Sequence, residues 1–256
     1  MMKLIDTHAH LDSVEDIDGA MDRAVRAGVS AVVAVGENLA ANRKNLAIAR
    51  RIERPRILVA LGIHPSEAGH EDVAASLAFI EEHIQEACAV GEIGLDFWYQ
   101  WARRDDAARN AQRDIYRRLL EVARQRDLPA VIHTRGAWRE ALETAKEMDV
   151  RKAVFHWYSG PLDVLDEILA AGYYVSASPS IAYSPESRRA IEAAPIERTL
   201  IETDSPVYYR CNGGFQAEPK EVFFTLRHYA ILKQLPEAEA AEILNRNAGA
   251  VFQTAD

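Results

Sequence analysis

Histidines and acidic residues recur in this sequence at the ends of short apolar segments, a pattern that indicates metal chemistry. Five of the eight histidines are placed in this way. His8 and His10 are two positions apart, so both side chains would point to the same side of a β-strand. The same pattern includes His64, Glu92, His133, His156 and Asp204. Imidazole and carboxylate groups together suit zinc, manganese, cobalt or iron, and a more oxygen-rich set would favour magnesium.

The combination of these residues argues more strongly for a metal than any one of them does. A single histidine such as His64 can equally be a hydrogen-bonded structural residue. Several histidines and acids converging on one place would be unfavourable on their own, because buried charge and unpaired polar groups are costly, and a divalent cation compensates for this. Cys88 and Cys211 lie outside the set, which argues against a structural zinc site. Asp6 and Glu202 are expected to orient histidines rather than to bind metal.

The segments that would position these residues are eight β-type runs separated by longer amphipathic stretches. The expected strands are residues 3–10, 29–36, 57–64, 87–95, 130–134, 153–156, 173–178 and 199–203. Most are solidly apolar, as parallel strands covered on both faces should be, and each interval has room for one helix. Eight such units in 256 residues predict a single (β/α)8 TIM barrel spanning residues 1–256. The barrel would gather the strand ends, and the metal site with them, at one face.

A doubly wound open sheet is the alternative architecture, but it would require a glycine-rich phosphate loop after the first strand, where this chain has histidines. Helix punctuation agrees with the barrel. Gly28 and Gly172 stand where helices should end, and Asp12 or Ser13 is expected to cap a helix that begins near Glu15.

Composition limits the classes of function. The chain has 30 basic and 39 acidic residues, a net charge of −9, so it would not bind nucleic acid through its overall charge. Phosphate recognition would have to be local, through a few arginines or bound cations. The longest apolar runs have five residues, far short of the roughly 20 of a membrane span, and the N-terminus does not have the pattern of a signal peptide. We expect a cytoplasmic protein without a membrane or an obligate protein partner.

At the level of motifs, the sequence resembles the TatD family of metal-dependent deoxyribonucleases, within the amidohydrolase-like superfamily. The blocks that carry the resemblance are Asp6-Thr7-His8-Ala9-His10, Gly62-Ile63-His64-Pro65, Gly91-Glu92-Ile93-Gly94-Leu95-Asp96, Glu202-Thr203-Asp204-Ser205-Pro206 and the closing Asn245-Arg246-Asn247-Ala248-Gly249-Ala250-Val251-Phe252. Together they run the length of the chain. Many superfamily relatives bridge two metals with a carboxylated lysine on the fourth strand, where this chain offers Glu92.

The resemblance implies a site with two divalent ions, Mg, Mn or Zn. It implies one ion at His8, His10, Glu92 and Asp204, and a second at His133 and His156, with Glu92 bridging both. The catalytic residues would be Asp204, Glu92 and His64, with Asp204 as the proton acceptor. The implied substrate is DNA, single-stranded or at its 3′ ends.

The chain departs from the family pattern in two segments that are expected to face substrate. Trp157-Tyr158 follows His156 where Cys-Phe is usual, and Gln216-Ala217-Glu218-Pro219 replaces Arg-Asn-Glu-Pro.

Four residues are candidates for holding a substrate. Arg135 could clamp a phosphate with its planar guanidinium, or pair with a neighbouring acid. Ser159 precedes an expected helix start, where backbone N–H groups can bind an anion. Trp98 and Trp101 are followed by arginines and could form a stacking platform for single-stranded bases, or else a loop that packs on its own aromatic rings.

Three functions are therefore compatible with the sequence. The first is hydrolysis of phosphodiester bonds, with DNA exonuclease activity as the resemblance implies. The second is the same metal machinery acting on a small ester, lactone, amide or phosphoester. The third is a metal-bound scaffold without catalysis, which is disfavoured because every expected ligand position is retained.

Overall fold

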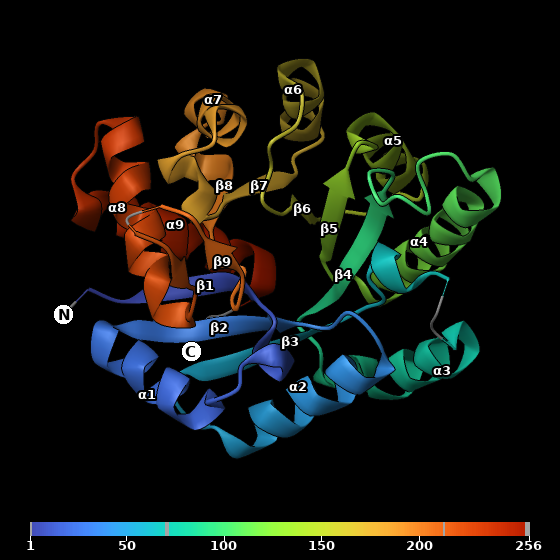
Figure 1. Ribbon diagram of the computed structural model, residues 1–256, viewed down its shortest axis with the longest axis horizontal. Coiled ribbons are helices and arrows are strands. Elements are labelled where there is room, and N and C mark those ends of the chain that lie inside the picture. Colours follow the sequence, from blue (N-terminus) through green and yellow to red (C-terminus); the bar gives the residue numbers. More distant parts are fainter. Residues whose placement is uncertain (1, 70–71, 212, 254–256) are drawn as a thin grey trace.

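The fold is built on eight parallel strands that follow one another in chain order around a barrel (Figure 1). The computed structural model describes residues 2–69, 72–211 and 213–253. The strands are β1 (Leu4–Ala9), β2 (Val29–Val35), β3 (Arg56–Leu61), β4 (Ala89–Asp96), β5 (Ala130–Arg135), β6 (Ala153–Phe155), β7 (Tyr174–Ala177) and β8 (Thr199–Ile201). A parallel bridge between Ala9 and Ser205 brings the last strand back to the first. The predicted TIM barrel is confirmed.

Helices cover the outside of the strands, as Figure 1 shows. They are α1 (Ile17–Ala27), α2 (Leu39–Arg51), α3 (Val73–His83), α4 (Asp106–Arg126), α5 (Trp138–Glu147), α6 (Leu162–Ala170), α7 (Pro185–Ala193), α8 (Val222–Lys233) and α9 (Glu237–Phe252). Between β8 and α8, a short hairpin pairs β9 (Tyr208–Tyr209) with β10 (Phe215–Gln216). Among the residues described, no helix has the length and apolar character needed to cross a membrane.

The strands are apolar throughout because both of their faces are buried. On β2, Val32 and Ala34 belong to the large core under the helices, whereas Val33 and Val35 belong to a second core inside the barrel. Side chains alternate between the two faces of a strand, so one continuous apolar run supplies both cores. Phe252 of α9 also packs into the inner core.

Helix α9 covers the amino ends of the strands. Its Asn245 accepts a hydrogen bond from the backbone N–H of Ile5 at 3.1 Å, and Asn247 donates to the backbone carbonyl of Thr199 at 2.8 Å. Both contacts lie where β1 and β8 begin. The carboxyl ends of the strands, at the opposite face, therefore carry the candidate site residues.

The predicted cap of the first helix is wrong, because a 3-10 turn precedes the helix and α1 begins later, at Ile17. Asp12 and Ser13 belong to a 3-10 turn, Leu11–Ser13, and α1 is capped instead by Asp16, whose carboxylate accepts the N–H of Gly19 at 3.1 Å. The predicted end is confirmed, since Gly28 adopts φ +108° directly after α1, a left-handed conformation that suits glycine.

Candidate active site

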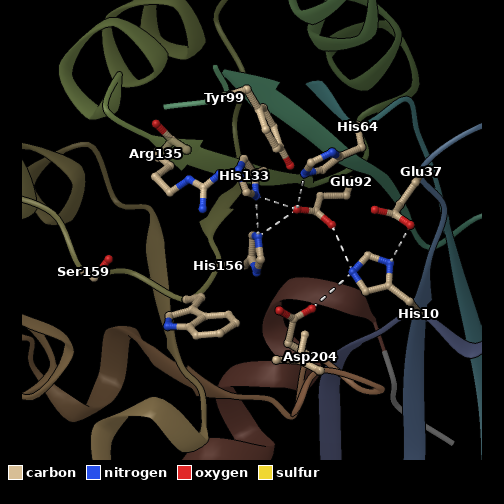
Figure 2. Close-up of a pocket in the computed structure, with 13 residues that line it drawn as sticks. His10, Glu37, His64, Glu92, Tyr99, His133, Arg135, His156, Ser159 and Asp204 are labelled. Carbon is tan, nitrogen blue, oxygen red and sulfur yellow. Dashed lines mark hydrogen bonds and ion pairs between the residues drawn. The ribbon is translucent and has the colours of Figure 1, made fainter. Parts of the chain in front are cut away.

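Glu92 on β4 lies at the centre of the site, and its two carboxylate oxygens face different histidines (Figure 2). Oε2 lies 3.1 Å from Nε2 of His8 and 3.4 Å from Nε2 of His10. Oε1 lies 3.0 Å from Nδ1 of His133 and 2.8 Å from Nε2 of His156. A carboxylate whose oxygens serve two separate groups of ligands has the arrangement that a metal bridge requires.

The first group of ligands joins the ends of β1 and β8. Oδ1 of Asp204 lies 3.1 Å from Nε2 of His10 and 3.5 Å from Nε2 of His8. The backbone N–H of Asp204 donates to the carbonyl of His8 at 2.9 Å, which ties the two strand ends together. Asp6 accepts hydrogen bonds from the backbone N–H of His8 at 3.4 Å and from the backbone N–H and hydroxyl of Thr203, so it holds both His8 and the segment that carries Asp204.

The second group joins β5 and β6. Nδ1 of His133 and Nε2 of His156 lie 3.3 Å apart, and both face Oε1 of Glu92. Glu202, which the sequence places as an orienting residue, lies behind His156, with its Oε1 3.4 Å from Nδ1 of His156. Carboxylates placed behind histidine ligands in this way fix the orientation of the ring and raise its basicity.

The two groups are direct neighbours. The imidazole rings of His8 and His156 stack with centroids 3.9 Å apart and planes within 8° of parallel. Two cations held by the two groups would therefore share one small space, as in hydrolytic sites with paired metals.

The charges of the site fit divalent cations. Burial favours the neutral form of Glu92, yet the surrounding histidines hold the pKa of its carboxyl well below the usual range. Likewise burial opposes ionisation of Asp204, but the neighbouring histidines lower its pKa to about 2. Burial also disfavours a charged His10, but Asp204 and Glu92 raise its pKa to about 10. Without metal, protons on the histidines balance the two carboxylates, and bound cations would replace those protons.

Unpartnered polar atoms also favour a bound cation. Among the described residues, Oδ1 of Asp204 is buried without a hydrogen-bond partner, even though Nε2 of His10 is only 3.1 Å away. Buried polar atoms nearly always have a partner. Two ligand atoms that approach each other without hydrogen-bond geometry are suited to a shared ion. His8, His10 and Glu92 place their ligand atoms within 4.8 Å of one another, as do His64, Glu92 and His133.

His64 contacts the site through a hydrogen bond donor rather than a free lone pair. Its Nδ1 accepts the backbone N–H of Ser66 at 3.1 Å, and its Nε2 lies 3.5 Å from Oε1 of Glu92. Burial lowers the pKa of His64 to about 3, which favours the neutral ring, and with Nδ1 accepting from Ser66 the proton would be on Nε2. That proton faces the centre, where it can donate to an oxygen atom.

A cavity of about 440 Å³ opens above these groups. Its lining residues include His10, Glu37, His64, Glu92, Tyr99, His133, Arg135, His156, Trp157, Ser159 and Asp204. In Figure 2, Arg135 and Ser159 lie on one side of the centre, and His10 and Glu37 lie on the other. The cavity therefore has the Arg135 guanidinium on one side and the Glu37 carboxylate on the other.

Two of the four expected substrate-binding residues, Arg135 and Ser159, line this cavity. Nη2 of Arg135 lies 2.9 Å from Oδ2 of Asp96, so the alternative of an ion pair with a neighbouring acid describes its resting contact. The pairing follows from register, because Asp96 of β4 stands opposite Arg135 of β5. The Arg135 side chain remains 44% exposed, which leaves guanidinium donors for a ligand.

The other two, Trp98 and Trp101, are not among the residues that line the cavity in the described part of the chain. Trp98 is 52% exposed and packs edge-on against Trp138, while Trp101 stacks on Tyr99 with ring centroids 5.7 Å apart. The contact of Trp101 corresponds to the alternative of a loop packed on its own aromatic rings, whereas Trp98 packs against the first residue of α5.

Five residues that line the cavity were not among the candidate site residues chosen from the sequence: Glu37, Tyr99, Thr134, Trp157 and Val207. Glu37 follows β2, and its Oε2 lies 3.7 Å from Nδ1 of His10. Its position directly after a barrel strand was a usable signal. For Trp157 the signal was its departure from the family pattern, and for Tyr99 it was the aromatic segment in which it lies.

A (β/α)8 barrel with histidines and carboxylates gathered at the carboxyl ends of its strands defines the class of amidohydrolase-like metal-dependent hydrolases. A family profile described as TatD related DNase matches residues 5–253. The chain belongs to this family of metal-dependent hydrolases.

Individual relatives agree with this assignment. The chain is 28% identical to human deoxyribonuclease TATDN3, over 97% of this chain and 94% of that protein. It is likewise 28% identical to the uncharacterized metal-dependent hydrolase YabD of Bacillus subtilis, over 98% of this chain and 99% of that protein. The crystal structure of YjjV, a TatD homologue from Escherichia coli, superimposes with a TM-score of 0.89 at 27% identity and covers 98% of each chain.

Proposed function

We propose that this protein is a two-metal phosphodiesterase that removes nucleotides from the ends of DNA. The observation that carries the proposal is the division of the Glu92 carboxylate, with Oε2 toward His8 and His10 and Oε1 toward His133 and His156. One divalent ion (Mg, Mn or Zn) would be held by His8, His10, Glu92 and Asp204, and the other by His133, His156 and Glu92.

Two divalent cations in these positions would supply the Lewis acidity that activates a water and neutralises charge on a phosphodiester. Asp204 would remain ionised beside the bound cations, which would take the place of the histidine charges that lower its pKa without metal. Its carboxylate is therefore available to accept the proton of the attacking water. His64 would donate from Nε2 to a phosphate oxygen or to the leaving oxygen, since Ser66 already occupies its Nδ1.

Arg135 and Ser159 would bind the phosphate on the side of the cavity away from Glu37. Arg135 has five N–H donors and uses only part of them on Asp96. With a net charge of −9, phosphate recognition has to be local. Arg135 and the bound metals would bind the phosphate without a basic surface.

The size of the cavity supports action at the end of a strand. A volume of about 440 Å³ lies in the range of sites for small ligands. It suits one nucleotide unit. A terminal nucleotide would enter the cavity while the rest of the strand remains outside.

The test is incubation of metal-loaded protein with end-labelled single-stranded DNA, with and without EDTA. We expect products that shorten from one end, and we expect EDTA to abolish them. If DNA is not cleaved but a lactone, amide or phosphoester is hydrolysed, the small-molecule alternative would replace this proposal. If protein that retains its metal turns over none of these substrates, a non-catalytic scaffold would be favoured.

A further inference from the structure

Trp157 is held in an unusual backbone conformation directly beside a candidate metal ligand. It follows His156 and adopts φ +42°, in the left-handed region that bulky residues rarely enter. Its N–H donates to the hydroxyl of Ser176 at 3.0 Å, and that hydroxyl donates to Glu202, the acid behind His156. The contacts that orient the ligand therefore also fix the backbone of Trp157. Such conformations persist where the surroundings enforce them, and they gather at functional sites.

The indole of Trp157 has a rigid support. Its ring packs on Tyr209 with centroids 5.6 Å apart and planes inclined by 37°. Tyr209 is fully buried, and its hydroxyl donates to the backbone carbonyl of Thr203 at 2.9 Å. Trp157 is itself half-buried and lines the cavity. The indole of Trp157 therefore offers the cavity a planar apolar surface. Tyr209 already holds this ring in place, so a ligand does not need to order it.

The charged residues of the cavity favour an orientation in which the base of a nucleotide lies near Trp157. Arg135 and Ser159 lie across the centre from Glu37 and His10. Ser159 is two residues after Trp157 in the same segment. A nucleotide whose phosphate meets the centre and Arg135 would turn away from the Glu37 carboxylate and bring its base toward the segment 157–159.

We infer that Trp157 forms a stacking subsite for the base of the nucleotide whose phosphodiester is cut. This inference rests on the proposed phosphodiesterase function and adds the recognition of the base to it. Every nucleobase has a planar π-face, so stacking on an indole tolerates any sequence. Trp157 lines the cavity near Ser159, whereas Trp98 and Trp101 do not line it, so in this inference Trp157 takes the place of the platform expected at Trp98 and Trp101.

The decisive experiment compares two oligonucleotides that differ only at the terminal residue, one with a normal base and one abasic. Both retain the same scissile phosphodiester. For the wild-type protein we expect kcat/KM to be about 5- to 150-fold higher on the substrate with the base, the range expected for one stacked base. Trp157→Phe should retain part of this ratio.

Two variants remove the ring while respecting the backbone. Asparagine tolerates left-handed φ, and glycine adopts it freely, so Trp157→Asn and Trp157→Gly can keep the fold where alanine would be strained. Both should reduce the ratio to about 1. Tyr183→Ala is the matched control, because Tyr183 is an exposed aromatic residue that does not line the cavity, and it should keep the wild-type ratio. A wild-type ratio in a folded Trp157→Asn or Trp157→Gly protein would overturn the subsite.

Binding separates this inference from the proposed function. Calorimetry of metal-loaded protein should show tighter binding of deoxyadenosine monophosphate than of deoxyribose 5-phosphate, and Trp157→Asn should remove the difference. If no oligonucleotide is cut but this difference is found, the subsite stands and the phosphodiesterase assignment fails. Equal affinities in the wild-type protein would reject the subsite even if DNA is cleaved.

Discussion

Oδ2 of Asp96 lies 3.0 Å from Nε2 of His133. The same oxygen lies 2.9 Å from Nη2 of Arg135, so one buried carboxylate holds both a candidate metal ligand and the candidate phosphate clamp. Its second oxygen accepts the backbone N–H of Trp98 at 2.8 Å. Asp96 therefore connects the candidate metal ligand to the candidate phosphate clamp.

From this contact we predict that Asp96→Asn weakens metal binding at the group of His133 and His156 by about 10- to 100-fold, the usual effect of losing the carboxylate behind a histidine ligand. Metal titration followed by elemental analysis measures the loss. KM for DNA should rise as well, since Arg135 loses its anchor. Metal affinity and KM equal to those of the wild type would show that Asp96 has no positioning role.

The two acids at the centre should respond differently to substitution. Glu92→Ala is expected to lose metal and activity together, because Glu92 contacts both groups of histidines. Asp204→Asn should keep the ion held by His133, His156 and Glu92 but lose about 10²–10⁴ in kcat, the range for general base catalysis.

Metal content beside kcat for both variants is the required measurement. Near wild-type turnover by Asp204→Asn would reject Asp204 as the proton acceptor. Retention of both ions by Glu92→Ala would reject the bridge.

The aromatic residues outside the cavity should matter only for longer substrates. Trp98 lies close to Arg135, whose guanidinium is 5.9 Å from its ring centroid. If Trp98 and Trp101 contact the strand beyond the terminal nucleotide, replacing both by alanine raises KM on a long oligonucleotide and leaves kcat unchanged, because stacking contributes roughly 1–3 kcal/mol per base to binding. On a dinucleotide KM should not change. An unchanged KM on the long strand would assign both residues to loop packing alone.

A pH-dependent contribution to stability is expected where the departure Gln216-Ala217-Glu218-Pro219 contacts α1. Arg23 binds both carboxylate oxygens of Glu218 at 2.8 Å and holds the pKa of that carboxyl below its usual range. A lowered pKa stabilises the fold above the unfolded-state value, about 4.3, and this stabilisation is lost as pH falls through the folded-state value.

Glu218→Gln should therefore lower the unfolding temperature more at pH 7 than at pH 3. Thermal unfolding at the two pH values measures this, with substitution of the exposed Glu242 of α9 by glutamine as the control. An equal decrease at both pH values would mean that packing, not the ion pair, is responsible.

Much of this architecture follows from the sequence alone. Each of the eight strands lies within two residues of its expected limits or inside them, because parallel strands covered on both faces are continuous apolar runs, whichever neighbours they pack against. Residues at the carboxyl ends of barrel strands must converge, so Glu92 and Asp204 could be placed in one site although 112 positions separate them.

Only the tertiary structure decided how these residues are used. Which oxygen of Glu92 faces which histidines, and the sharing of Asp96 between His133 and Arg135, depend on register between strands. The choice between Trp98 and Trp157 as a cavity wall depends on loop conformation, and a φ of +42° at Trp157 leaves no trace in hydrophobic periodicity. Periodicity reports which face of a regular element is buried, whereas the direction of a loop side chain is set by contacts with distant residues such as Ser176 and Tyr209.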